Sequence, residues 1–189
     1  MLRIYVVRHG QDEDNAQGIL NGRRDMPLTT VGKNQILDLA KQMKNDHIFL
    51  SDIYCAPLRR TLRSASIIAS VLGAGEPKIL DSLIERDFGV MTGRRTVDIE
   101  SCCEPEIIKT EDVIYFLSPP GAETFPQLLA RAETVLRTIR EQHPDGDILL
   151  VTSGDIGKMI YAVYYGLEWE KALASFNFKN STLLLLSGN

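Results

Sequence analysis

The sequence has no surplus of basic residues, no long hydrophobic run, and few histidines or cysteines. Its 189 residues include 21 Lys and Arg against 25 Asp and Glu, which gives a formal net charge of −4. This balance argues against a general nucleic-acid or anionic-membrane binder, so a basic site has to be local and built from a few convergent arginines. No window approaches the roughly 18 apolar residues of a membrane span, and Arg8 interrupts the apolar start too early for a signal peptide. We therefore expect a cytoplasmic protein.

The scarcity of cysteine and histidine narrows the possible chemistry. Cys55 stands alone and Cys102 is adjacent to Cys103, a pattern that fits neither an ordinary disulfide nor a zinc site. We expect a reducing compartment and structural roles for these cysteines. The histidines and acidic residues form no ligand spacing, so we expect no metal and no cofactor. Any imidazole chemistry has to come from one of three residues, His9, His47 and His143.

The remaining composition is that of an average globular chain, 44% hydrophobic and 24% charged, and its length suits one domain over residues 1–189. Five apolar runs are typical of buried strands, namely residues 2–7, 48–55, 78–81, 148–152 and 182–186. Helical patterns begin at four places between them, namely Thr29 or Thr30, Pro57, the residues after Gly121, and Gly154. This alternation predicts an α/β fold, a three-layer α/β/α sandwich around a mostly parallel sheet. Residues 83–120 show a weaker pattern and are expected to form a small loop-and-helix excursion that acts as a cap.

Two turns lie where ligands bind in such sheets, beyond the carboxyl ends of the strands. Arg8-His9-Gly10 follows the first strand, and Ser153-Gly154-Asp155 follows the strand over 148–152. A neutral histidine held at a strand end is a competent nucleophile toward phosphorus. The guanidinium of Arg8 offers a planar fork for phosphate oxygens, which a lysine could not match. A histidine at a strand end is also often a structural, hydrogen-bonded residue, so the tripeptide alone does not show whether His9 is catalytic or structural.

The tripeptide is the first member of an ordered series of motifs that spans essentially the whole chain. The series continues with Gln11, Asn15, Asn21-Gly22, Pro27-Leu28-Thr29, Ala56-Pro57-Leu58-Arg59-Arg60-Thr61, Leu83-Ile84-Glu85-Arg86-Asp87-Phe88-Gly89, Pro120-Gly121-Ala122-Glu123-Thr124-Phe125 and residues 148–155. In this order the motifs resemble those of the histidine phosphatase superfamily, which includes the cofactor-dependent phosphoglycerate mutases and many small phosphatases. The resemblance implies a phosphoglycerate mutase-like fold.

The resemblance also implies a metal-independent phosphomonoesterase that acts through a phosphohistidine. His9 would attack phosphorus, Arg8 and Arg60 would clamp the phosphoryl oxygens, and Glu85 would protonate the leaving alkoxide and then activate water. The two arginines suit a loose transition state, in which negative charge is spread over three phosphoryl oxygens. Further phosphate and substrate contacts are expected from Asn15, the backbone near Gly22, Gly154, Arg86 and Arg94. The expected partner is a small phosphorylated metabolite, and the oligomeric state stays open.

Two positions depart from the family pattern. The family places a second histidine after its last core strand, where this chain has Ser153. A serine can still donate a neutral hydrogen bond, but losing a preorganised transition-state donor typically costs roughly 10²–10³ in rate. Asp12 stands where the family usually has threonine or serine, and it either faces the phosphate, which it would oppose, or points to solvent. His47 and His143 are expected to be solvated residues at helix ends rather than substitutes for the missing histidine.

Three functions are compatible with this sequence. The first is a phosphomonoesterase with reduced activity, because Ser153 replaces the second histidine. The second is a catalytically silent module that binds phosphorylated ligands and keeps the fold and the arginines. The third is a phosphoglycerate mutase-type phosphotransferase, which needs the phosphohistidine to outlive the departure of one substrate. The excursion over 83–120 is short for an elaborate cap, so it favours hydrolysis over transfer.

Overall fold

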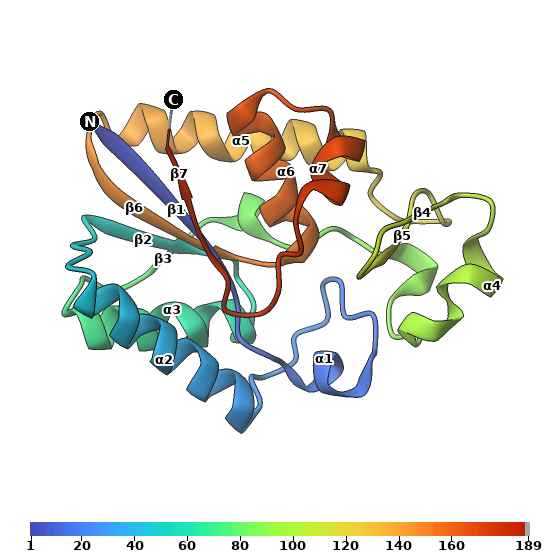
Figure 1. The fold of residues 1–189 in the computed structure, drawn as a ribbon, viewed down its shortest axis with the longest axis horizontal. Helices are drawn as coiled ribbons and strands as arrows, with labels where there is room; N and C mark the ends of the chain where they lie inside the picture. Colours follow the sequence, from blue (N-terminus) through green and yellow to red (C-terminus); the bar gives the residue numbers. More distant parts are fainter. Residues whose placement is uncertain (188–189) are drawn as a thin grey trace.

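A computed structural model describes residues 1–187 and has a five-stranded sheet at its centre (Figure 1). The strands are β1 (Leu2–Arg8), β2 (Asp52–Cys55), β3 (Lys78–Ile79), β6 (Gly146–Thr152) and β7 (Leu183–Leu186). They lie in the order β3–β2–β6–β1–β7, so the first strand of the chain pairs with the last two. Only β7 runs antiparallel to its neighbour, and the other pairs are parallel. The predicted mostly parallel sheet is confirmed.

Helices cover both faces of this sheet. The larger helices are α2 (Thr30–Asn45) and α3 (Arg59–Leu72) on one face and α5 (Phe125–Gln142), α6 (Gly154–Tyr165) and α7 (Trp169–Ser175) on the other. Figure 1 shows the second group above the sheet and the first group below it. The predicted α/β/α sandwich is therefore confirmed.

The apolar character of the strands follows from this double cover. Successive side chains of a strand point to opposite faces of its sheet. In β1, Ile4 and Val6 pack in the core on the α5–α6 side, while Tyr5 and Val7 pack in the core on the α2–α3 side. Because neither face meets water, the strand has almost no polar positions until it reaches Arg8 and the edge where the sheet ends.

Several element boundaries differ from the predicted ones, and local backbone bonds explain the largest difference, at the start of β2. The backbone of His47 is left-handed with φ of 56°, and the Ile48 N–H donates to the carbonyl of Met43 at 3.0 Å. These features close the C-terminal end of α2 and keep Ile48 out of the sheet, so β2 begins only at Asp52. Helix α3 begins at Arg59 rather than at Pro57, because Leu58 is still extended.

Residues 83–120 form an irregular excursion at one side of the sandwich (Figure 1). It contains η2 (Gly89–Met91), η3 (Thr96–Asp98), α4 (Ile99–Cys103) and a hairpin of β4 (Ile107–Lys109) and β5 (Ile114–Phe116). A separate apolar cluster holds it together, made of Leu20, Phe88, Met91, Ile99, Cys103 and Phe116. The hairpin was not predicted, because strands of three residues are too short to show an alternating pattern.

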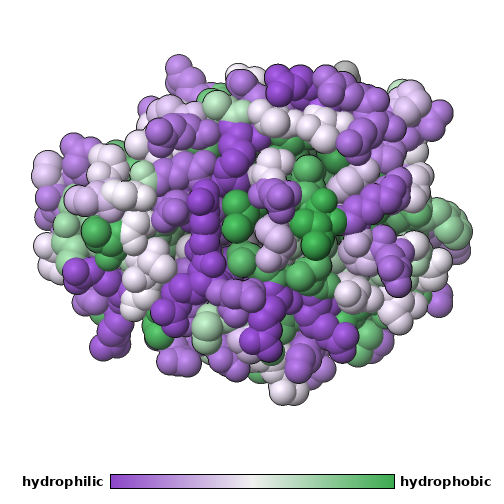
Figure 2. Space-filling view, turned by 180° about the vertical axis from the view of Figure 1, so that it is seen from behind, coloured by the Kyte–Doolittle hydropathy of each residue, from purple (hydrophilic) through white to green (hydrophobic). Residues whose placement is uncertain are grey.

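The remaining short elements are α1 (Glu13–Gln17), inside a segment predicted as a loop, and η1 (Asp81–Leu83). No helix within residues 1–187 combines the length and the apolarity needed to cross a membrane. Figure 2 shows that hydrophilic residues cover most of the back face, with apolar residues gathered mainly toward its middle.

Candidate active site

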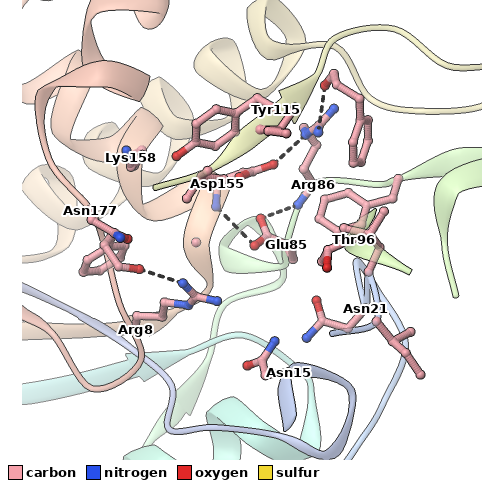
Figure 3. A pocket seen from close by; sticks show the side chains of 18 residues that line it. Arg8, Asn15, Asn21, Glu85, Arg86, Thr96, Tyr115, Asp155, Lys158 and Asn177 are labelled. Atoms are coloured by element: carbon pink, nitrogen blue, oxygen red, sulfur yellow. Dashed lines mark hydrogen bonds and ion pairs between the residues drawn. The ribbon is translucent and has the colours of Figure 1, made fainter. Parts of the chain in front are cut away.

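The carboxyl ends of β1 and β6 meet at one edge of the sheet, and a cavity of about 160 Å³ lies there (Figure 3). The strand register pairs Arg8 with Thr152, and the His9 N–H donates to the carbonyl of Thr152 at 2.9 Å. His9 and Ser153 therefore follow neighbouring strand ends. Polar residues lining the cavity include Arg8, Asn15, Asn21, Glu85, Gly154 and Asp155. His9, Arg60 and Ser153 lie behind this lining and are almost fully buried. We call Arg8, His9, Arg60, Glu85 and Ser153 the floor.

His9 is held in a state suited to nucleophilic attack. Its side chain is buried, with 1% of the residue exposed, and Nδ1 lies 2.7 Å from the carbonyl oxygen of Gly10. Because a carbonyl only accepts, Nδ1 carries the hydrogen and Nε2 keeps its lone pair. Burial lowers the pKa of His9 well below its ordinary value, and the charges of Arg60 and Arg8 lower it further. The imidazole is therefore neutral at neutral pH.

Arg60 lies in the first turn of α3 and is fully buried. Its Nη1 donates to the carbonyl of Arg24 and its Nη2 to the carbonyl of Gly22, each at 2.6 Å. The structure thus places the carbonyl of Gly22 on the guanidinium, whereas the sequence predicted N–H groups of this backbone on the phosphate. These bonds fix the plane of the guanidinium beneath the cavity.

Two arginine nitrogens stand out among the buried polar atoms. The Nη1 of Arg8 donates to the carbonyl of Phe178 at 2.7 Å. Within residues 1–187, the only buried side-chain nitrogen or oxygen atoms without a hydrogen-bond partner are Nε of Arg8 and Nε of Arg60. A buried donor left unpaired costs about 1–3 kcal/mol, so such atoms in a native site call for a function. Both belong to the residues predicted to clamp phosphate.

Glu85 is buried at the N-terminal end of α6. Its carboxylate accepts from the backbone N–H groups of Arg86 at 2.7 Å, Asp155 at 3.2 Å and Ile156 at 3.2 Å (Figure 3). Burial raises the pKa of Glu85, and the charge of Asp155 raises it further, against the effect of these bonds. A carboxyl with a raised pKa next to a histidine with a lowered one is the arrangement that general acid catalysis needs.

The two departures from the family pattern contact the same guanidinium. The hydroxyl oxygen of Ser153 lies 3.5 Å from Nη2 of Arg60, and an oxygen of Asp12 lies 3.6 Å from its Nε. Asp12 is fully buried and accepts from the Asn15 N–H at 2.7 Å and from the Asn21 amide at 2.6 Å. Of the two orientations that the sequence left open, pointing to solvent is therefore wrong.

The predicted substrate-contacting residues separate into two groups. Asn15, Gly154 and Arg86 line the cavity, but Arg94 is exposed and lines a different cavity beside Cys102 and Cys103. All three nitrogens of the Arg86 guanidinium donate hydrogen bonds within the protein: Nε donates to Asp155 at 2.8 Å, and the other two donate to two carbonyls. Its guanidinium also lies 4.4 Å from the ring centres of Phe116 and Phe125. Arg86 is thus a buried cross-link between the excursion and the sheet edge.

The segment 176–182 before β7 also contributes to the site and was not predicted. The Asn180 amide donates to the carbonyl of His9 at 3.0 Å and to Oδ1 of Asn15 at 3.1 Å, and Phe178 accepts from Arg8. Lys158 holds the start of this segment, since its ammonium donates to the carbonyls of Leu173 and Phe176. Burial lowers the pKa of Lys158 to about 8. A polar Asn-Phe-Lys-Asn run was the only available signal.

Apolar side chains form the opposite boundary of the cavity. We call these residues the outer wall: Leu20, Phe88, Val113, Ile114, Tyr115 and Phe116. All except Leu20 belong to the excursion, and the rings of Phe88 and Phe116 meet edge to face at 5.1 Å. Because the wall is apolar, it suits the organic part of a ligand rather than its charged group.

The other two histidines do not approach the floor. His47 is exposed at the end of α2, as predicted. His143 is not solvated as predicted, because its ring lies 2.9 Å from the hydroxyl oxygen of Tyr54 and only a small part of its side chain is exposed. Cys55 is buried in the core, which raises the pKa of its thiol to about 11. Residues 1–187 contain no group of three or more potential metal ligands.

Comparisons with known proteins give one matching family and several similar sequences and structures. A model of the histidine phosphatase superfamily (branch 1) matches residues 4–188. The probable phosphoglycerate mutase GpmB of Photorhabdus laumondii is 33% identical over 154 residues, which cover 82% of this chain and 70% of that protein. The solved structure of open reading frame Rv3214 from Mycobacterium tuberculosis superposes with a TM-score of 0.81 at 23% identity, covering 97% of this chain and 90% of that one. A phosphoserine phosphatase from Entamoeba histolytica, solved with 3-phosphoglyceric acid, gives a TM-score of 0.76 at 23% identity, with 98% and 90% covered.

Proposed function

The chain belongs to branch 1 of the histidine phosphatase superfamily, and we propose that it is a metal-independent phosphomonoesterase that acts through a phosphohistidine at His9. One observation carries the proposal: His9 is buried near two arginines at the carboxyl end of β1, with Nε2 free of the bond that holds Nδ1. The unpaired Nε of Arg8 supports it, because a phosphoryl group supplies the acceptor that this atom lacks.

In this proposal the phosphoryl group enters between Arg8, Asn15 and Glu85. The lone pair on Nε2 of His9 forms a bond to phosphorus while the phosphorus–oxygen ester bond breaks, and the leaving oxygen takes the proton of Glu85. Water then attacks the phosphohistidine and passes a proton back to Glu85, which releases inorganic phosphate. The arginines stabilise the negative charge on the phosphoryl oxygens in both steps.

The outer wall supports a small substrate with an apolar part next to the phosphate. Within residues 1–187 the cationic side chains that line the cavity are those of Arg8, Arg86 and Lys158. Arg86 already donates to Asp155 and two carbonyls, and Lys158 donates to the carbonyls of Leu173 and Phe176. We therefore propose that the phosphate is recognised by the floor and the remainder of the substrate by shape and apolar contact.

A second function, silent binding of a phosphorylated ligand, is favoured by Ser153. A hydroxyl at 3.5 Å from Arg60 supplies a neutral donor where the family has a histidine. Loss of that donor slows phosphoryl transfer without removing the arginines that bind phosphate. The two functions thus share a binding site and differ in turnover.

Turnover of an aryl phosphate at mildly acidic pH, in the intact protein and in His9→Ala, separates them. For the phosphomonoesterase we expect phosphate release that disappears in His9→Ala, and acid quenching of the intact protein that traps an acid-labile phosphoryl group on His9. Saturable phosphate binding without release supports the silent module. Equal release by both proteins contradicts the role of His9. A His47→Ala variant is the matched control, because that histidine is exposed and far along the chain from the floor.

A further inference from the structure

Asp12 is a buried carboxylate whose role the proposed reaction does not explain. It is the N-cap of α1, and neither it nor the Arg60 side chain has any exposed surface. An N-cap needs only a side-chain oxygen that accepts from the backbone, which serine, threonine or asparagine supplies without a charge. Burying a carboxylate is costly unless it is paired, so its charge at this position points to a partner.

That partner is Arg60. One Asp12 oxygen lies 3.6 Å from Nε of Arg60, and this oxygen also accepts from the amide of Asn21 at 2.6 Å. The carbonyls of Arg24 and Gly22 hold the other two nitrogens of the guanidinium. Asp12 therefore faces the only nitrogen of Arg60 that has no hydrogen-bond partner, the atom that the proposed phosphate would otherwise find unopposed.

The charges around His9 can be added up. Arg8 and Arg60 contribute two positive charges, and Asp12 removes one of them. Arg86 and Asp155 compensate each other at 2.8 Å. Lys158 lines the same cavity, but burial lowers its pKa to about 8, so most of it is uncharged at about pH 8.5. With Glu85 protonated, as in the proposed reaction, the floor offers one net positive charge to a ligand, where two arginines without Asp12 would offer two.

We propose that Asp12 sets the charge preference of this site, so that it is matched to a singly charged tetrahedral oxyanion rather than to a doubly charged one. The inference depends on the proposed function only for the place where the anion binds, between Arg8 and Arg60. Asp12 acts through Arg60 and is a positioning residue rather than a catalytic one.

Two probes of the same shape but different charge test this. At about pH 8.5 phenylphosphonate carries two negative charges and benzenesulfonate carries one, and neither can be hydrolysed. All affinities are measured in a Glu85→Gln background, so that position 85 carries no charge at this pH. Because Coulomb energy scales with ligand charge, removing the charge of Asp12 improves the free energy of binding twice as much for the dianion as for the monoanion. The fold gain in affinity for phenylphosphonate should therefore be the square of the gain for benzenesulfonate, about 10-fold against about 3-fold.

The variant is Asp12→Asn, measured by titration calorimetry. It keeps the bond from the Asn15 N–H, and a flip of the Asn21 amide restores the second bond. Asp12→Ser, which also keeps an N-cap oxygen, should change both affinities in the same direction. Asp14→Asn is the matched control, because Asp14 is buried on the same helix but pairs with Arg24 at 2.7 Å. It should leave both affinities unchanged.

Each outcome of these titrations either supports or overturns the inference about Asp12. Equal gains for the two probes indicate a merely structural role of Asp12, and this overturns the inference, as does no gain in a folded Asp12→Asn. If Asp14→Asn raises the affinity for either probe as much as Asp12→Asn does, the inference is overturned too. If neither probe binds any of the variants, the anion site is absent and the proposed function fails together with the inference. If the charge-dependent gain is found but the phosphohistidine is not, only the catalytic part of the proposed function fails.

Discussion

Four of the five floor residues of the candidate active site lie at the ends of regular elements, whereas Glu85 and most of the outer wall belong to the irregular excursion. Arg8 and His9 end β1, Arg60 begins α3, and Ser153 caps α6. The register of β1 and β6 therefore fixes where Arg8, His9 and Ser153 lie. The wall depends instead on a hairpin of two three-residue strands and on a small apolar cluster of its own.

This difference separates chemistry from selectivity. The floor holds charged groups that hydrogen bonds and ion pairs lock in place, so a change there should alter the rate of reaction. The wall offers apolar contact area, so a change there should alter how tightly the organic part of a substrate binds. Substitutions in the floor should therefore have larger effects on activity than substitutions in the wall.

Glu85→Gln tests whether the floor supplies a proton. We expect kcat for an alkyl phosphate to fall roughly 10²–10⁴-fold, because glutamine keeps the acceptor but cannot protonate the leaving oxygen. For 4-nitrophenyl phosphate the loss should be much smaller, since that leaving group needs no proton. Steady-state kinetics with both substrates measure the contrast. Equal losses for the two substrates contradict a role as general acid, and circular dichroism checks that the variant is folded.

Ser153→His tests the missing family histidine. A second imidazole beside Arg60 should raise kcat/KM for an aryl phosphate at least tenfold, since one preorganised transition-state donor is worth roughly 10²–10³ in rate. Ser66→His on the exposed face of α3 is the control and should have no effect. If a folded Ser153→His shows no gain, Ser153 does not belong to the floor.

The dependence of kcat on pH tests the two opposite pKa shifts. His9 must be neutral, which holds above its lowered pKa, and Glu85 must be protonated, which holds below its raised pKa. We therefore expect an acid limb below the range of an ordinary histidine, and an alkaline limb that falls about tenfold per pH unit for an alkyl phosphate. The alkaline limb should vanish in Glu85→Gln. Its persistence there assigns the limb to another group.

Ile114→Ala tests the wall. Ile114 is partly buried in the hairpin and lines the cavity. Removing its side chain should raise KM for an aryl phosphate about 3- to 10-fold through lost apolar contact, while kcat stays within twofold. Inhibition by inorganic phosphate should be unaffected. Val90→Ala, on the exposed part of the excursion, is the matched control. A large fall in kcat instead shows that the wall takes part in the chemistry.

Alkylation of Cys102 should have the smallest effect. This thiol is exposed, and it lines the second cavity, of about 390 Å³, together with Arg94. We expect a thiol reagent to modify Cys102 within minutes and to change kcat/KM less than twofold. Cys55 should stay unmodified, because burial raises the pKa of its thiol to about 11. Mass spectrometry identifies the modified residue, and Cys102→Ser shows whether any loss of activity comes from it.

The comparison between floor and wall also explains what the sequence could predict. Long elements such as α5 and β6 carry many repeats of one period, so their type follows from the pattern. Most floor residues lie at the ends of regular elements, and the motifs around His9, Arg60 and Glu85 identified the floor through the family resemblance. The helices and strands of the excursion are too short to show a repeating hydrophobic pattern. For that reason nothing in the sequence distinguished Arg86, which points into the protein, from Arg94, which does not.

Two features depend on contacts between distant residues, and local patterns do not encode them. The meeting of Asp12 with Arg60 joins the start of α1 to the start of α3. The bonds from Asn180 to His9 and from Arg8 to Phe178 join opposite ends of the described chain. Only the folded arrangement shows that Asp12 faces an arginine instead of solvent.

The pairing of β1 with β6 and β7 has a consequence for the order of folding. Asn180, which holds the backbone of His9, lies 171 positions away along the chain, and Thr152 is also distant. Contacts between residues so far apart in sequence form more slowly than local ones. Helices α2 and α3 can therefore form from local contacts before His9 has a fixed position, and the floor is completed only when the whole sheet has assembled.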